Sequence, residues 1–130
     1  NSAFSLSKAL LPSLKQSPDA RIIFTSSSVG REGRAHWGAY AVSKFAIEGL
    51  MQTLAEELEK TSTIRVNSLN PGGTRTSMRK SAFPAEDPKT QPLPKELMPV
   101  YLYLLSEESK PIHGKAIDVR DFEPANYLPK

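Results

Sequence analysis

The stretch that decides the fold runs Arg21-Ile22-Ile23-Phe24-Thr25-Ser26-Ser27-Ser28 and leads, through a loop that carries glycine, into Gly38-Ala39-Tyr40-Ala41-Val42-Ser43-Lys44. The apolar run at 21–25 has the length and residue types of a short buried strand. Apolar residues then recur at three- and four-residue steps over 39–60 and predict a long helix. A strand followed by a loop and a helix is the start of a β-α-β unit.

The same alternation continues on both sides of this stretch. The pattern at 4–14 predicts an opening helix, which ends before Pro18-Asp19. A second strand is predicted at 64–69, a further helix at about 96–106 and a last strand at 116–119. Helices that alternate with parallel strands predict the α/β class with a doubly wound parallel sheet.

A candidate proton-transfer site lies at the beginning of the long helix. Tyr40 and Lys44 are four residues apart, so a helix places them on one face. Nearby positive charge favours the phenolate, and a tyrosine tuned in this way can act as a general acid or base. Ser27 follows the first strand, at the edge where open α/β sheets bind ligands. The alternative interpretation is a half-buried tyrosine beside a solvated lysine.

The order of these features, completed by Asn70-Pro71-Gly72-Gly73, resembles the short-chain dehydrogenase/reductase family over nearly the whole chain. The resemblance implies that residues 1–130 are the carboxyl-terminal part of a single NAD(P)-binding, Rossmann-like domain. The amino-terminal half, which binds the cofactor phosphates, would then precede Asn1. We therefore expect this piece to be inactive by itself.

The resemblance also implies roles for individual residues. Tyr40 matches the catalytic acid/base, and Lys44 matches the residue that binds the nicotinamide ribose and tunes the tyrosine. Ser27, thirteen residues before Tyr40, matches the serine that binds the substrate carbonyl. Ser26 and Ser28 are the alternatives if the register differs by one residue.

A second set of residues is expected to hold the cofactor, which would be NAD or NADP. The run Pro71-Gly72-Gly73-Thr74-Arg75-Thr76 is similar to the family's Pro-Gly-x-Val/Ile-x-Thr stretch, which holds the nicotinamide carboxamide. The residues implied in cofactor binding are Tyr40, Lys44, Pro71, Gly72, Gly73, Thr74 and Thr76. Asn67 and Asn70 receive no role, because asparagines at strand ends usually form turns.

The function implied by the resemblance is hydride transfer between NAD(P)(H) and a small carbonyl or alcohol substrate, in a cytoplasmic homodimer or homotetramer. The rival interpretation is a noncatalytic Rossmann-like binding or assembly module that acts through subunit contacts, since a fold does not guarantee its chemistry.

Composition excludes several other classes. The chain has no cysteine, which excludes disulfides, thiol catalysis and zinc-thiolate sites. His36 and His113 have no carboxylate at ligand spacing, so no metal site is expected. The formal net charge is +3, but basic and acidic residues are interleaved and no nucleic-acid-binding motif accompanies them. No apolar run approaches the length of a membrane span.

The segment from Gly72 to Pro94 is rich in proline and poor in apolar residues, and we expect an irregular, functional loop there. The resemblance implies that it is a substrate lid. Arg75, Arg79 and Lys80 could attract an acidic or phosphate-bearing substrate, although charged lid residues are often only solvated.

Overall fold

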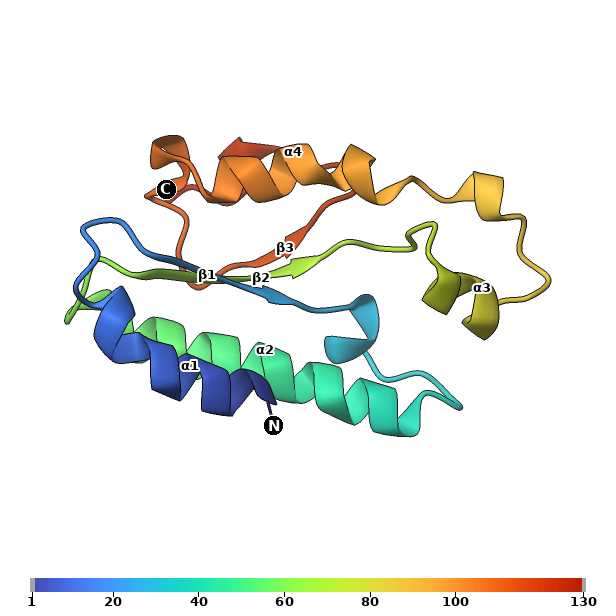
Figure 1. The fold of residues 1–130 in the computed structure, drawn as a ribbon, viewed down its shortest axis with the longest axis horizontal. Helices are drawn as coiled ribbons and strands as arrows, with labels where there is room; N and C mark the ends of the chain where they lie inside the picture. Colours follow the sequence, from blue (N-terminus) through green and yellow to red (C-terminus); the bar gives the residue numbers. More distant parts are fainter. Residues whose placement is uncertain (1, 130) are drawn as a thin grey trace.

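The computed structural model describes residues 2–129 and has three layers, with helices on both faces of a central sheet (Figure 1). The sheet contains β1 (Arg21–Thr25), β2 (Arg65–Asn70) and β3 (Ala116–Asp118) in the order β1-β2-β3. Both pairings are parallel, so the predicted α/β class with a parallel sheet is confirmed.

Two long helices cover one face of the sheet and a third covers the other. Helices α1 (Ser2–Leu14) and α2 (Gly38–Glu59) lie together below the sheet in Figure 1, and α4 (Pro94–Leu104) lies above it. The short helix α3 (Ser77–Ala82) lies beyond the carboxyl ends of the strands. Among residues 2–129, no helix is both long and apolar enough to cross a membrane.

The strand register brings the segments of interest to one edge. Thr25 is paired with Leu69, and Asn70 with Asp118. The backbone N–H of Ser26 then donates to the carbonyl of Leu69 at 2.8 Å, which extends the pairing one residue beyond β1. The loops that follow β1, β2 and β3 therefore start side by side at the carboxyl edge of the sheet.

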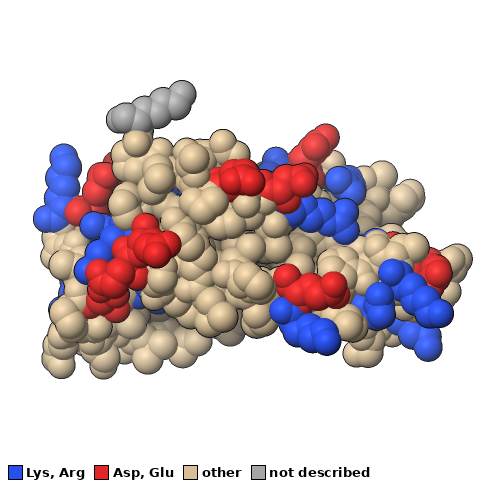
Figure 2. All heavy atoms as spheres, turned by 90° about the horizontal axis from the view of Figure 1, so that it is seen from above, with Lys and Arg blue, Asp and Glu red and all other residues tan. Residues whose placement is uncertain are grey.

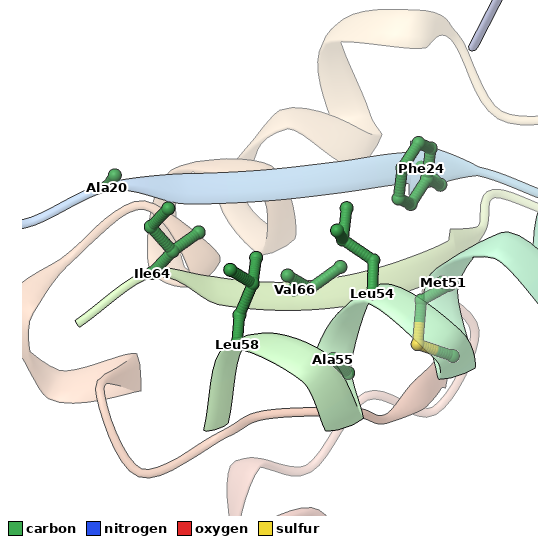
Figure 3. Close-up of a cluster of buried hydrophobic side chains, with 8 residues drawn as sticks. All are labelled: Ala20, Phe24, Met51, Leu54, Ala55, Leu58, Ile64 and Val66. Atoms are coloured by element: carbon green, nitrogen blue, oxygen red, sulfur yellow. The ribbon is translucent and has the colours of Figure 1, made fainter. Parts of the chain in front are cut away.

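Two apolar clusters hold the layers together. The cluster between the sheet and α2 is shown in Figure 3 and contains Ala20, Phe24, Met51, Leu54, Ala55, Leu58, Ile64 and Val66. The cluster on the opposite face contains Leu69, Leu104, Ile112 and Ile117. Burying one side chain of this size stabilises a fold by about 1.5–3 kcal/mol, so the clusters make the sheet edge a firm platform for the loops.

The predicted elements are confirmed with small shifts in their bounds. Strand β2 starts at Arg65 and extends to Asn70, one residue later at each end than predicted. Helix α4 starts at Pro94, so Pro99 lies inside it, where proline cannot donate a backbone hydrogen bond. The Glu96 carboxylate accepts a hydrogen bond from the N–H of Leu93 at 2.5 Å and caps the start of this helix.

The segment from Gly72 to Pro94 is more regular than its composition predicted. Thr76 caps α3 by accepting a hydrogen bond from the N–H of Arg79 at 3.1 Å. Asp87 caps a 3-10 turn over Pro88–Thr90 in the same way, through the N–H of Lys89 at 2.9 Å. Side-chain caps of this kind satisfy backbone donors that a short helix leaves free.

Candidate functional site

The three consecutive serines after β1 have different environments. Ser26 is buried, and its hydroxyl has no hydrogen-bond partner among the described residues. Ser27 is half-buried with extended backbone angles and starts the 3-10 turn Ser28–Gly30. Ser28 is exposed. Ser27 is thus the half-buried serine at the carboxyl edge of the sheet, between a buried and an exposed neighbour.

Lys44 reaches from α2 to the end of β1. Its ammonium donates a hydrogen bond to the carbonyl of Thr25 at 2.9 Å, two residues before Ser27. The same nitrogen lies 5.6 Å from the centre of the Tyr40 ring, a cation–π contact. The structure therefore brings the predicted lysine to both the predicted tyrosine and the strand that leads to the predicted serine.

Tyr40 is held from its other side by an aromatic neighbour. The Trp37 ring, at the start of α2, meets the Tyr40 ring edge-on with centroids 5.5 Å apart. Tyr40 nevertheless remains 37% exposed. A phenol that is fixed in position and still open to solvent is available to a molecule bound at the sheet edge.

Gly30 sets the distance between the serine loop and α2. A Cβ placed on Gly30 would lie 2.8 Å from the Lys44 carbonyl oxygen and 2.9 Å from the Lys44 Cβ. Real Cβ atoms do not approach backbone atoms so closely, so only glycine allows this packing. The turn that begins at Ser27 consequently rests on the helical turn that carries Lys44.

The predicted cofactor loop follows β2 at the same edge. Gly72 has φ = +71°, a left-handed conformation that favours glycine, and its N–H donates to the Asn70 side chain at 3.0 Å. Gly73 packs so closely on the side chain of Gln91 that a Cβ would collide with it. The loop is thus fixed by the strand end on one side and by the following segment on the other.

The remaining predicted cofactor residues lie along this loop. The Thr74 hydroxyl donates to the Gly72 carbonyl at 3.3 Å, and the Thr76 hydroxyl is the cap of α3. A surface hollow of about 290 Å³ lies beside the loop, and its walls are Asn70, Gly72, Asp118, Arg120 and Asp121. The crevice outside the carboxyl ends of the strands is where open α/β sheets bind their ligands.

The arginines of the 72–94 segment are engaged within that segment. Arg75 donates to the carbonyls of Pro88 at 2.8 Å, Lys89 at 3.2 Å and Gln91 at 3.1 Å. These contacts fold the segment back on itself. They argue against Arg75 as an attractor of anionic substrates, because its Nε and Nη2 already donate to backbone carbonyls.

Arg79 is paired with a carboxylate of the same segment. Two of its nitrogens bind the two Glu86 carboxylate oxygens, each at 2.7 Å, and its guanidinium lies 3.8 Å from the centre of the Phe83 ring. The hydrogen bond from Arg79 holds the pKa of Glu86 below its usual value, and the same bond raises the pKa of Arg79. The hypothesis that this arginine attracts substrate therefore loses its support, whereas Lys80 is exposed.

Charge elsewhere on the surface is mixed. On the face shown in Figure 2, lysines and arginines are interleaved with aspartates and glutamates. Within residues 2–129, no group of three or more histidine, cysteine, aspartate or glutamate side chains is arranged to hold a metal ion. His113 instead bridges the N–H of Val66 at 3.1 Å and the carbonyl of Ala55 at 2.8 Å, which is a packing role.

Sequence reasoning missed one group of polar residues beneath the site. Arg31 forms ion pairs with both Glu48 and Asp118, and Asn70, to which no role had been assigned, donates a hydrogen bond to Asp118. One feature of the sequence could have indicated this group. Glu48 is a charged residue on the buried stripe of α2, together with Ala41, Met51 and Ala55.

Comparison with known proteins agrees with this fold. A sequence model of the short chain dehydrogenase family matches residues 1–87, and the chain belongs to this family. Among curated proteins, it is 53% identical over 120 residues to the uncharacterized oxidoreductase YciK of Escherichia coli. That match covers 92% of this chain and 47% of the relative.

Two solved structures are close in both sequence and shape. A short chain dehydrogenase from Salmonella enterica serovar Typhi is 55% identical with a TM-score of 0.89, over 92% of this chain and 49% of that one. A Shigella flexneri protein solved in complex with NADP is 53% identical with a TM-score of 0.88, over the same shares of each chain. The chain spans about half the length of the relatives it matches.

Proposed function

We propose that these residues belong to an NAD(P)(H)-dependent oxidoreductase that interconverts a carbonyl and an alcohol by hydride transfer. The single observation that carries the proposal is the position of Lys44, which contacts the Tyr40 ring and binds the Thr25 carbonyl beside Ser27. A merely solvated lysine, the alternative interpretation of the sequence, would have no reason to lie across the end of β1.

The proposal assigns each residue a task. Tyr40 gives a proton to the substrate oxygen when a carbonyl is reduced and takes it back when an alcohol is oxidised. The positive charge of Lys44 favours the phenolate form of Tyr40 and attracts the ribose hydroxyls of the cofactor. The Ser27 hydroxyl donates a hydrogen bond to the substrate oxygen and stabilises the charge that develops there.

The loop after β2 has features that fit the nicotinamide end of NAD or NADP. Gly72 is exposed and has a left-handed backbone, so the loop turns at the sheet edge with no side chain at this position to stand between the backbone and a ligand. Pro71, Thr74 and Thr76 complete the proposed cofactor contacts, together with Tyr40 and Lys44. The NADP complex of the Shigella flexneri relative supports NAD or NADP as the cofactor. When bound, the cofactor supplies or accepts the hydride.

Subunit contacts form a second part of the proposal. Helix α1 contains no fully buried residue, and large apolar side chains are exposed on α1 and α2, namely Phe4, Leu6, Leu10, Val42 and Phe45. Exposed apolar clusters mark surfaces that bind other proteins. We propose a homodimer or homotetramer that uses these helices, a small-molecule substrate and a cytoplasmic location. The same surface is the observation that favours the alternative, a noncatalytic assembly module.

The test separates the two functions in the full-length gene product. NADPH fluorescence is followed on mixing with the protein, and NADPH consumption is then measured with 4-nitrobenzaldehyde, phenylglyoxal and diacetyl as carbonyl probes. The proposal predicts nucleotide binding and turnover of at least one probe. Tight self-association with no change in NADPH fluorescence would support the assembly module. We also expect the 130-residue chain alone to show no turnover.

A further inference from the structure

A connected set of polar side chains lies under the site and has no part in the proposed proton transfer. At its centre, the Arg31 guanidinium makes three contacts, one to α2 and two to β3. Its Nε donates to Glu48 of α2 at 3.0 Å, Nη1 donates to Asp118 of β3 at 3.0 Å, and Nη2 donates to the carbonyl of Ile117 at 3.2 Å.

The contacts continue from Asp118 to the proposed cofactor loop. The second oxygen of Asp118 accepts a hydrogen bond from the Asn70 side-chain amide at 2.7 Å. The oxygen of that amide accepts from the N–H of Gly72 at 3.0 Å. Arg31 is therefore joined to the backbone of the loop after β2 through two intervening side chains.

The backbone of Arg31 is joined to the proposed substrate-binding serine. The N–H of Gly30 donates to the Ser27 carbonyl at 2.9 Å, and the N–H of Arg31 donates to the Ser28 carbonyl at 3.1 Å. Arg31 is thus the last residue of the short turn that starts at Ser27. A displacement of Arg31 would displace that turn.

The burial of Glu48 distinguishes this network from an ordinary ion pair on the surface. Glu48 is only 5% exposed. Its carboxylate oxygen that does not bind Arg31 accepts a hydrogen bond from the buried Ser68 hydroxyl at 2.7 Å. A buried carboxylate requires a cation and hydrogen bonds to offset its lost hydration. An apolar residue at position 48 would complete the stripe of α2 without this cost, so stability alone does not explain the ion pair.

We propose that Arg31 is a positioning residue that fixes the Ser27 loop relative to the Pro71–Gly73 loop, and so holds the substrate oxygen in register with the nicotinamide. Hydride transfer is sensitive to misplacement of this order, since a shift of about 1 Å can reduce a rate about a hundredfold. This inference rests on the proposed function, because it assigns one binding task to each loop.

The test compares four variants of the full-length gene product by thermal unfolding, NADPH affinity and kcat with the best carbonyl probe. Arg31→Gln removes the centre of the network but leaves Glu48 buried without its cation. Arg31→Gln/Glu48→Gln removes both charges and restores neutrality. Asp118→Asn, at a half-exposed position, leaves one acceptor oxygen for the two donors Arg31 and Asn70, so it disconnects Arg31 from the arm toward Gly72. Arg34→Gln is the matched control, because Arg34 is an exposed arginine in the same loop.

We expect the Arg31→Gln/Glu48→Gln protein to unfold near the wild-type temperature yet to lose about tenfold or more in kcat and in NADPH affinity. Asp118→Asn is expected to weaken NADPH binding about tenfold with a smaller loss in kcat, and Arg34→Gln to change neither. A merely structural role predicts instead that activity returns together with stability.

Two results would overturn the inference. One is a double variant with wild-type kcat and NADPH affinity. The other is a stable Asp118→Asn protein with wild-type NADPH affinity. This second result settles the question even when the Arg31 variants do not fold. The proposed function fails separately, by absence of NADPH turnover in the unsubstituted protein. Wild-type turnover together with fully active variants therefore removes only the role of Arg31.

Discussion

The ammonium of Lys44 donates a hydrogen bond to the Thr25 carbonyl at 2.9 Å and so ties helix α2 to the carboxyl end of strand β1. This contact joins the two elements that carry Tyr40 and Ser27, although nineteen residues separate Thr25 from Lys44. It gives Lys44 a structural task at the site, in addition to the charge that it supplies.

Replacing Lys44 by methionine should therefore damage cofactor binding. The substitution removes the ammonium that is proposed to bind the cofactor ribose hydroxyls, and a charge-assisted hydrogen bond contributes about 1.5–3 kcal/mol, so NADPH affinity should fall about tenfold or more. Fluorescence titration of the full-length protein measures the change. Lys60→Met, at the exposed carboxyl end of the same helix, is the control and should bind NADPH normally. Equal affinities of the two variants would contradict the assignment.

Gly30→Ala tests the packing of the serine loop on α2. The new methyl group would meet the Lys44 carbonyl oxygen at 2.8 Å, so the loop or the helix must move. Overpacking of this kind costs about 1–3 kcal/mol in the free energy of unfolding. Denaturant unfolding measures this loss.

The matched control for Gly30→Ala is Gly49→Ala in helix α2, where a Cβ meets nothing within 4 Å. Alanine is a better helix former than glycine, so this change should stabilise the protein by about 0.5–1 kcal/mol. Two alanine substitutions would then shift stability in opposite directions. A neutral Gly30→Ala protein would show that the loop does not rest on Lys44.

The Arg79–Glu86 pair predicts that the folding of the 72–94 segment depends on pH. The pKa of Glu86 is lowered by its hydrogen bond from Arg79. A carboxyl group with a lowered folded-state pKa stabilises the fold above its unfolded pKa, and this stabilisation is lost as the pH falls through the folded value. The pair is partly exposed, so we expect its contribution to be small.

Trp37 offers a direct readout of this change. Its ring lies 5.9 Å from that of Phe83, the residue on which Arg79 packs, and it is the single tryptophan of the chain. Tryptophan fluorescence should change on acidification below the ordinary range of a glutamate, and Glu86→Gln should lack this step. Subtracting the fluorescence of the Trp37→Phe protein from that of the unsubstituted protein isolates the contribution of Trp37. An unchanged acid step in Glu86→Gln would assign it to another group.

The exposed face of α1 and α2 predicts self-association. Val42 is 70% exposed, and a glutamate at this position places a charge within the proposed apolar contact. Val42→Glu should shift the full-length protein to a smaller species in light scattering after size exclusion, while its helical content is preserved. Lys60→Glu changes the charge by an equal or larger amount at the carboxyl end of α2, far along the helix from Val42 and Phe45, and should leave the mass unchanged. A monomeric wild-type protein would refute the proposed dimer directly.

The sheet, the two long helices and their order could be predicted because each is encoded locally. The run at 21–25 has three consecutive apolar residues at its centre, Ile22, Ile23 and Phe24, and the stripe from Ile47 to Leu58 repeats with the helical period. Tyr40 and Lys44 share a helix, so their proximity also follows from local spacing. The structure confirms the elements and places the Lys44 ammonium 5.6 Å from the centre of the Tyr40 ring.

The polar network could not be predicted, because its contacts join residues far apart in the chain. Arg31 and Asp118 are 87 residues apart, and nothing near either residue indicates the other. Asn70 was interpreted as a turn former, and it does bind the N–H of Gly72, but its amide also reaches Asp118. The helix α3 was missed for a related reason, since it depends on the backbone angles that let Thr76 cap it.

The central claim is that Tyr40 moves the proton during hydride transfer. The most direct measurement is a single-turnover assay of the full-length Tyr40→Phe protein, in which loss of NADPH absorbance is followed with the best carbonyl probe while NADPH affinity is measured in parallel. Phenylalanine keeps the ring that contacts Trp37 and Lys44 and removes only the hydroxyl. The account predicts NADPH affinity within about twofold of wild type and a rate reduced by about a hundredfold or more. A rate equal to that of the unsubstituted protein would contradict it.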